Sequence, residues 1–117
     1  MANVLVYIES QGAEISSSSL ELIVAAQEIA RATGGSVEAL IAAADPDTLA
    51  AKVRGADRVL TVTDSSLTPY VPESHGRVLT HVVKERLPDL VLVAYSSCGL
   101  DLGPTLAVRT DRPLIGY

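Results

Sequence analysis

Short aliphatic runs alternate along this chain with segments in which apolar residues recur every three or four positions. The runs have few polar interruptions, which is typical of strands in a parallel sheet that is covered on both faces. The pattern predicts four strands, and the last five residues are a candidate for a fifth. The predicted strands are residues 4–8, 37–41, 59–62 and 90–94, with residues 113–117 as the fifth.

Three helices are predicted between the strands from apolar stripes at helical spacing. The first follows the serines at residues 16–19, which are expected to form a solvated loop and helix cap, and it stops at Gly34. The second starts after Asp45, where a proline suits the first helical position, and ends near Gly55. The third has its apolar face between residues 78 and 87.

This alternation of strand and helix implies right-handed crossovers between parallel strands. The expected fold class is α/β, with a doubly wound, mostly parallel sheet of about five strands and helices on both faces, Rossmann-like and adenine-nucleotide-hydrolase-like. The longest irregular stretch is residues 64–74, where Pro69 and Pro72 argue against a hidden helix. Because no repeat or linker is found, residues 1–117 are predicted to form one domain.

Composition narrows the class of protein further. A chain of 117 residues that is 48% hydrophobic can bury a usable core. Its single cysteine excludes an intramolecular disulfide, no signal-peptide pattern opens the chain, and no apolar run approaches the ~20 residues of a membrane span. A formal net charge of −5 opposes non-specific attraction to nucleic acid or anionic lipid. We therefore expect a cytoplasmic protein, or a mitochondrial matrix protein in a eukaryote, with protein or small-molecule partners.

The turn after the fourth strand is the candidate functional edge. A small-residue turn there leaves backbone N–H groups at the carboxyl edge of the sheet, where open α/β proteins place ligands or docking surfaces. Asp101 is predicted to cap the next helix, with Pro104 in its first turn. A carboxylate at that helix start would repel a phosphate, so a self-capped helix is favoured over a phosphate site. The candidate cofactor-binding residues at this edge are Ser96, Ser97, Gly99 and Asp101.

Other chemistries have little support in the sequence. Neither a dinucleotide fingerprint nor a Walker loop is present. His75 and His81 are six residues apart and so do not share a helix face as metal ligands would. Cys98 is expected to be an ordinary small residue rather than a reactive thiol. The sequence therefore predicts no metal site and no catalytic residues, and a small hydrolase built on Ser96 or Cys98 would lack an identifiable base.

The order of the segments resembles the amino-terminal domain of the electron-transfer flavoprotein alpha subunit over essentially the whole chain. The sharpest part is a Gly-x-Asp-x-x-Pro turn followed by a small apolar helix. Leu100 and Thr105 depart from the family pattern, which commonly has basic residues there. The segments that carry the resemblance are residues 4–9, Leu20-Glu21-Leu22 with Ala25-Ala26, Gly34-Gly35 before residues 37–42, residues 55–60, residues 88–92, Gly99-x-Asp101-x-x-Pro104, Leu106-Ala107-Val108-Arg109 and Asp111-Arg112-Pro113.

The resemblance implies a division of labour. In that family the alpha subunit pairs with a beta subunit, and the heterodimer carries electrons from flavin-dependent dehydrogenases to a membrane quinone reductase or another acceptor. FAD lies mainly on a carboxyl-terminal domain of the alpha subunit that this chain lacks, so no cofactor is expected here. The beta subunit binds AMP at its comparable sheet edge, whereas the alpha domain generally does not. Family alpha chains are considerably longer, so a fragment or a stand-alone relative is expected.

The leading interpretation is therefore a non-catalytic structural and partner-docking domain of an electron-transfer flavoprotein alpha subunit. An exposed sheet edge could also pair two copies of the chain. The alternative is a small adenine-nucleotide-binding protein of the universal-stress type, which shares the fold class. That class should have a spaced glycine and Ser/Thr phosphate loop after the fourth strand, which Ser97-Cys98-Gly99-Leu100-Asp101 does not reproduce.

Overall fold

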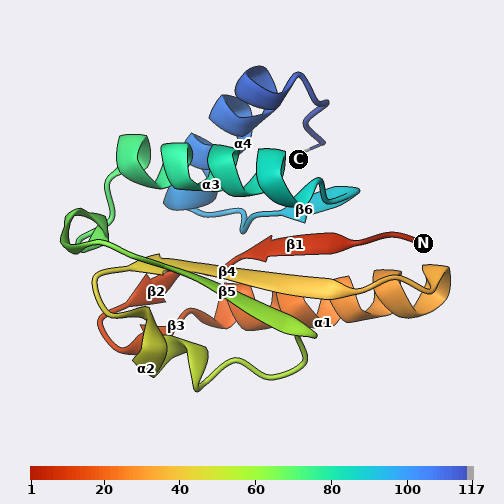
Figure 1. Ribbon diagram of the computed structural model, residues 1–117, viewed down its shortest axis with the longest axis horizontal. Coiled ribbons are helices and arrows are strands. Elements are labelled where there is room, and N and C mark those ends of the chain that lie inside the picture. The colour runs from red at the N-terminus through yellow and green to blue at the C-terminus, as the bar shows by residue number, and fades with distance from the viewer. Residues whose placement is uncertain (116–117) are drawn as a thin grey trace.

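A parallel four-stranded sheet forms the middle layer of the computed structural model, which describes residues 1–115 (Figure 1). The strand order is β5-β4-β1-β6, so the chain moves outward from β1 to one side and returns to place β6 on the other. This arrangement confirms the doubly wound α/β class. The strands are β1 (Val4–Tyr7), β4 (Val37–Ala43), β5 (Arg58–Thr63) and β6 (Leu90–Leu92).

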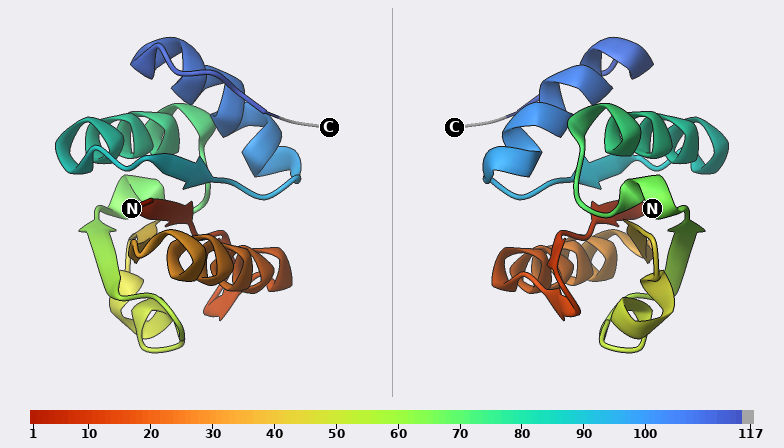
Figure 2. Two further views of the ribbon diagram at one scale, coloured as in Figure 1. Left: turned by 90° about the vertical axis from the view of Figure 1, so that its right-hand side faces the viewer. Right: turned by 90° about the vertical axis from the view of Figure 1, so that its left-hand side faces the viewer.

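Helices cover both faces of this sheet. Two of them, α1 and α2, lie on one side, and α3 and α4 lie on the other, as both views of Figure 2 show. No helix within residues 1–115 is both long enough and apolar enough to cross a membrane. The helices are α1 (Ser17–Thr33), α2 (Pro46–Ala50), α3 (Pro72–Arg86) and α4 (Ser97–Thr110).

Alternation along β1 divides the core into two halves. Val4, Val6 and Ile8 pack in the layer that contains α1 and α2. Leu5 and Tyr7 pack in the layer that contains α3 and α4. Because successive side chains of a strand point to opposite faces, one buried strand supplies both cores, and the residues that follow it emerge at the carboxyl edge between the two layers.

The sheet differs from the expected one at its fifth strand. Residues 113–115 contain no strand, and residues 116–117 lie outside the described part of the chain, so the described sheet has four strands rather than about five. A small antiparallel hairpin was missed instead, formed by β2 (Ser10–Gln11) and β3 (Glu14–Ile15). Its two-residue turn contains Gly12 at φ +62°, a left-handed conformation that favours glycine.

The stretch at residues 64–74 is more ordered than the prolines suggested. It contains the 3₁₀ helix η1 (Ser65–Leu67), and α3 already begins at Pro72. The argument from Pro72 was wrong because a proline is well suited to the first turn of a helix, where its missing N–H group would have no partner. Leu67 is buried and anchors this stretch to the core.

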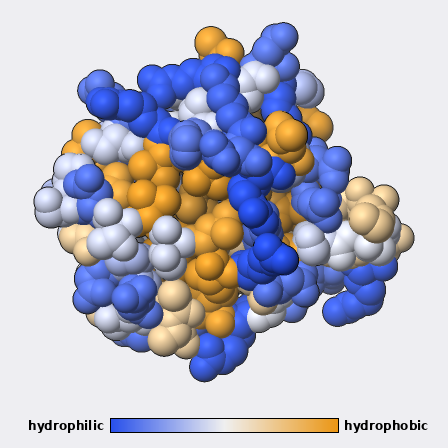
Figure 3. All heavy atoms as spheres, in the orientation of Figure 1, coloured by the Kyte–Doolittle hydropathy of each residue, from blue (hydrophilic) through white to orange (hydrophobic). Residues whose placement is uncertain are grey.

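The strand β5 forms one edge of the sheet and carries a mixed surface. Its exposed residues include Arg58, Thr61 and Thr63, whereas Val59 and Val62 are half-buried. In Figure 3 apolar atoms accordingly show between hydrophilic ones on the face where β5 lies in front. Exposed polar side chains of this kind discourage a strand from pairing with another chain.

Candidate functional site

A hollow of about 740 Å³ opens at the carboxyl edge of the sheet, where the turn after the fourth strand was expected to form a site. We call it the carboxyl-edge hollow. Its walls come from the residues after β1, the β2–β3 hairpin, the segment around η1 and the start of α4. Ser96 and Ser97 line it, whereas Gly99 is buried within the first turn of α4 and Asp101 is exposed on that helix.

The cap of α4 is Ser96 and not Asp101. The Ser96 Oγ accepts a hydrogen bond from the N–H of Gly99 at 3.2 Å, and the helix begins at Ser97. Asp101 therefore lies inside the helix, and Pro104 is an interior proline. The prediction was wrong because serine caps a helix as well as aspartate does, and the earlier cap is the one that tertiary contacts hold in place.

The contact that holds Ser96 comes from Glu9, which follows β1. The two carboxylate oxygens of Glu9 lie 2.9 and 2.8 Å from Ser96 Oγ, whose hydroxyl donates to them. The backbone N–H of Glu9 donates to Ser19 Oγ at 2.8 Å, and its carbonyl accepts from the N–H of Ser16 at 2.9 Å. We call this set of contacts the Glu9 junction. It joins the first turns of α1 and α4, which lie on opposite faces of the sheet.

The serines before α1 are only partly as expected. Ser16 is the N-cap of α1, because its Oγ accepts from the N–H of Ser19 at 3.2 Å. The expectation of a solvated segment is wrong for Ser19, whose side chain is fully buried. Its Oγ is needed there as the partner of the Glu9 N–H group. Sequence reasoning missed Glu9, although its place directly after a strand, at the same edge as Ser96, was a signal that could have found it.

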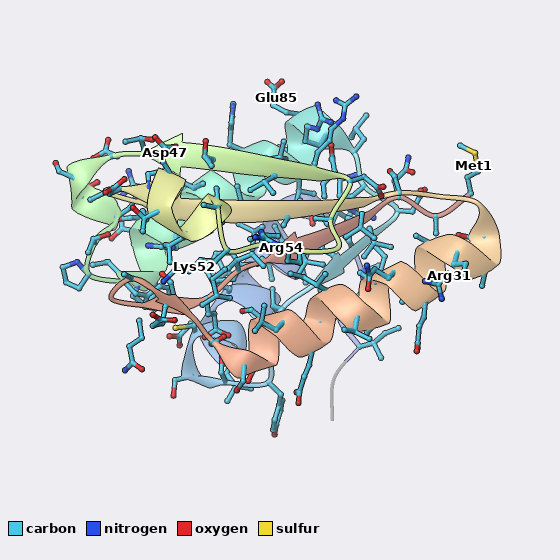
Figure 4. The ribbon with its side chains drawn as sticks, turned by 90° about the horizontal axis from the view of Figure 1, so that it is seen from below. Met1, Arg31, Asp47, Lys52, Arg54 and Glu85 are labelled. Atoms are coloured by element: carbon cyan, nitrogen blue, oxygen red, sulfur yellow. The ribbon has the colours of Figure 1, made fainter. Side chains whose placement is uncertain are left out.

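The electrostatics of the hollow are negative. Glu9 and Asp45 both line it, and none of the described lining residues is a lysine or an arginine. Lys52 lies in the turn just after α2 (Figure 4), but its Nζ donates to the carbonyl of Ala13 at 2.6 Å and pairs with Glu14 at 3.1 Å. That cation therefore holds the hairpin and is not directed into the hollow.

Two side chains in the hollow have raised pKa values. Burial, with smaller contributions from the hydrogen bond and the charge of Glu9, raises the pKa of Cys98 to about 11. Burial raises the pKa of Tyr70 to about 12, with smaller contributions from Cys98, Asp101 and Glu9. A protonated thiol is a poor nucleophile, so this site favours the interpretation of Cys98 as an ordinary small residue.

A buried histidine was also missed by sequence reasoning. His75 is 5% exposed; its Nδ1 lies 2.7 Å from the hydroxyl of Tyr7, and its Nε2 lies 2.8 Å from the carbonyl of Leu67. Because a carbonyl only accepts, Nε2 carries the hydrogen, and the Tyr7 hydroxyl donates to Nδ1. Burial raises the pKa of Tyr7, which keeps this donor protonated. The histidine thus ties η1 to β1.

The second histidine has a different environment. His81 is exposed on α3 and lies 3.9 Å from Glu85. Within residues 1–115 no group of three side chains is arranged to hold a metal ion. The two histidines therefore act separately in this structure.

Comparison with known proteins identifies the family. Residues 4–117 match the family described as electron transfer flavoprotein domain. The chain belongs to this family. The match spans both helical layers and every residue of the Glu9 junction.

Several relatives of this chain are described as electron transfer subunits. The electron transfer flavoprotein subunit alpha of Clostridium acetobutylicum is 28% identical over 113 residues, which is 95% of this chain and 34% of that protein. The subunit alpha of Bacillus subtilis is 38% identical over 61 residues, 52% of this chain and 19% of that protein. The acryloyl-CoA reductase electron transfer subunit beta of Anaerotignum propionicum is 26% identical over 114 residues, 96% of this chain and 31% of that protein.

These matches confirm the predicted resemblance of this chain to the amino-terminal domain of the electron-transfer flavoprotein alpha subunit. The chain spans about a third of the length of the Clostridium acetobutylicum relative.

Proposed function

We propose that this chain is a non-catalytic structural and docking domain that binds an electron-transfer flavoprotein beta subunit. In the assembled protein it supports electron transfer from flavin dehydrogenases to a downstream acceptor. The observation that carries the proposal is the family match over residues 4–117, together with relatives that are electron transfer subunits.

The geometry of the carboxyl edge supports the part of the proposal that concerns cofactors. In α/β proteins that bind nucleotides, a phosphate meets free N–H groups and a positive dipole at a helix start. At the start of α4, Ser96 caps the helix and the Glu9 carboxylate already provides the negative charge. These residues do not fit the pyrophosphate of FAD, and we expect the flavin of the full-length protein to be held by residues outside this chain.

The docking half of the proposal is tested by capture on a tagged beta subunit from the same organism. The purified chain should co-elute with it, and an unrelated α/β protein of similar size should not. Absence of co-elution at protein concentrations well above micromolar would reject the beta subunit as partner.

The cofactor half is tested separately by incubating the chain with excess FAD, desalting it and recording its visible spectrum. The chain should remain colourless, whereas a full-length alpha subunit treated in the same way should retain yellow flavin. Flavin retained in equal molar amount by the chain alone would overturn the assignment of this region as a scaffold.

One observation favours the alternative, a small adenine-nucleotide-binding protein. The carboxyl-edge hollow of about 740 Å³ falls within the size range of small-molecule sites. Its carboxylates argue against this ligand class, and calorimetry with AMP and ATP decides between the two. We expect no measurable heat of binding, and a micromolar dissociation constant, which corresponds to about 8 kcal/mol, would favour the alternative.

A further inference from the structure

The Glu9 carboxylate has acceptor capacity that the fold does not use. Each carboxylate oxygen has two lone pairs, and the described contacts supply that side chain with two donors, the hydroxyl of Ser96 and the thiol of Cys98, which leaves lone pairs unused. Glu9 is partly exposed and lines the hollow, so its remaining lone pairs are accessible there. The contact with Ser96 holds the group in one position, which lowers the entropy lost when a further donor binds.

The walls of the hollow add an apolar surface next to this charge. Ile8, Leu49 and Leu67 line it together with the ring of Tyr70. Asp45 contributes a second carboxylate from the start of α2. The hollow therefore combines negative charge with apolar walls, and its lining within residues 1–115 contains no lysine or arginine.

Charge complementarity identifies what fits such a hollow. An anion would be repelled by Glu9 and Asp45, and an apolar group would remove water from a carboxylate without supplying a counter-charge. A lysine or arginine side chain satisfies both requirements, because its methylene groups can pack on apolar walls while its head donates to the carboxylate.

We propose that the carboxyl-edge hollow receives a lysine or arginine side chain of a protein partner, with Glu9 as its principal counter-charge. This inference rests on the proposed docking function and names the contact through which docking occurs. Asp45 adds a second negative charge to the lining, and residues of the β2–β3 hairpin line the hollow as well.

The contact is tested first without any partner protein, by NMR titration of the full chain with N-acetyl-arginine amide. Shift changes should be saturable and confined to amides around the hollow, such as Ser10, Gln11, Thr68 and Cys98. The uncharged isostere N-acetyl-citrulline amide should produce none of them. Equal shifts with citrulline, or shifts spread over all acidic surfaces, would overturn the proposal.

Variants locate the counter-charge. Glu9→Gln keeps the shape of the side chain and should weaken arginine binding about threefold, as expected for loss of a partly exposed ion pair. Glu28→Gln, on the exposed face of α1, serves as the matched control and should leave binding unchanged. Asp45→Asn, which breaks no cap hydrogen bond, should weaken binding less than Glu9→Gln and tests the charge effect independently of the Glu9 junction. Equal affinity of all four proteins for the arginine amide contradicts the proposal.

Capture on the beta subunit then separates this inference from the proposed function. If the wild-type chain and Glu28→Gln are captured and Glu9→Gln is captured less, both stand. If all three are captured equally, docking stands and the hollow is not its contact. If none is captured, the beta subunit is rejected as partner, and the arginine titration alone decides whether the hollow binds a basic side chain.

Discussion

The helices α1 and α4 begin with the same type of serine cap, but the residue that donates to each cap makes a different contact with the rest of the protein. In each, a serine Oγ accepts from the N–H three residues later at 3.2 Å, from Ser16 to Ser19 in α1 and from Ser96 to Gly99 in α4. In α1 the residue that donates to the cap is a buried serine, Ser19, and its Oγ in turn accepts a hydrogen bond from the N–H of Glu9. In α4 the corresponding residue is Gly99, and the start of the helix lies against the carbonyl of Ala94. One local motif can thus form a polar junction or a close backbone contact, depending on a single side chain.

The largest expected effect comes from removing the close contact. In Gly99→Ala the new Cβ would overlap the carbonyl oxygen of Ala94, so the start of α4 must move. We expect a loss of about 3 kcal/mol in the free energy of unfolding, measured by denaturant titration. Gly76→Ala in α3 is the matched control, because the nearest atom that its Cβ would meet on another helix is Thr105 Cγ2 at 3.8 Å, an ordinary contact distance. Equal unfolding midpoints for the two variants would show that the contact with Ala94 is not restrictive.

The polar junction should be the next most sensitive point. Ser19→Ala leaves the N–H of Glu9 buried without its acceptor, which should cost about 1–3 kcal/mol. Ser18→Ala changes an exposed serine in the same turn and should stay within about 0.5 kcal/mol of the wild type. Equal denaturant midpoints for the Ser19→Ala and Ser18→Ala variants would contradict the buried hydrogen bond.

The identity of the α4 cap predicts a smaller difference. Ser96→Ala removes the cap acceptor and the donor to Glu9, and should cost about 0.5–2 kcal/mol. Asp101→Ala should change stability by less than about 0.5 kcal/mol, because Asp101 is an exposed residue inside the helix. A larger loss for Asp101→Ala than for Ser96→Ala would restore the aspartate as the cap.

The last prediction concerns reactivity rather than stability, at the thiol beside the α4 start. Because the folded pKa of Cys98 is about 11 and its ordinary value is 9.0, the thiol remains protonated until the pH rises well above 9. Alkylation by iodoacetamide at pH 8 should therefore be about a hundredfold slower than for a thiol of ordinary pKa, and should accelerate between pH 9 and pH 11. A raised pKa also means that the thiol's contribution to stability is complete below pH 9 and decreases above it.

Glu9 provides the control for that reactivity. Burial is the main cause of the raised pKa of Cys98 and persists in Glu9→Gln, but the charge of Glu9 is lost and the amide oxygen that replaces the carboxylate is a weaker acceptor. Alkylation should accelerate in this variant and be unchanged in Glu28→Gln. Identical pH profiles in all three proteins would show that Glu9 does not influence the thiol.

The sequence was most informative about the elements and least informative about what joins them. The apolar runs located β1, β4, β5 and β6, because burial on both faces leaves a direct mark on composition. The hairpin over residues 10–15 was missed because two-residue strands are too short to show alternation. Around residue 100 the prediction placed the helix cap at Asp101, whereas the structure has Ser96 as the cap, held by its contact with Glu9.

The candidate site was predicted as a place but not as a set of contacts. The carboxyl edge follows from the parallel topology, and Ser96 and Ser97 do line the hollow there. Glu9 and His75 were not predicted, because their partners Ser96 and Tyr7 are 87 and 68 residues away along the chain. Pairings of that separation leave no periodicity in the sequence.

The same separation bears on the order in which the molecule assembles. Closing the 87-residue interval between Glu9 and Ser96 requires the β1–β6 half of the sheet to be in place, whereas the turns of α1 and α4 need only local contacts. We therefore infer that the contact between Glu9 and Ser96 forms after the main folding barrier, unlike the local contacts of Glu9 with Ser16 and Ser19. Interactions that are absent from the transition state mainly slow unfolding. The contact between Glu9 and Ser96 is then expected to change the rate of folding little and to slow unfolding, which prolongs the time for which the two helical layers stay joined.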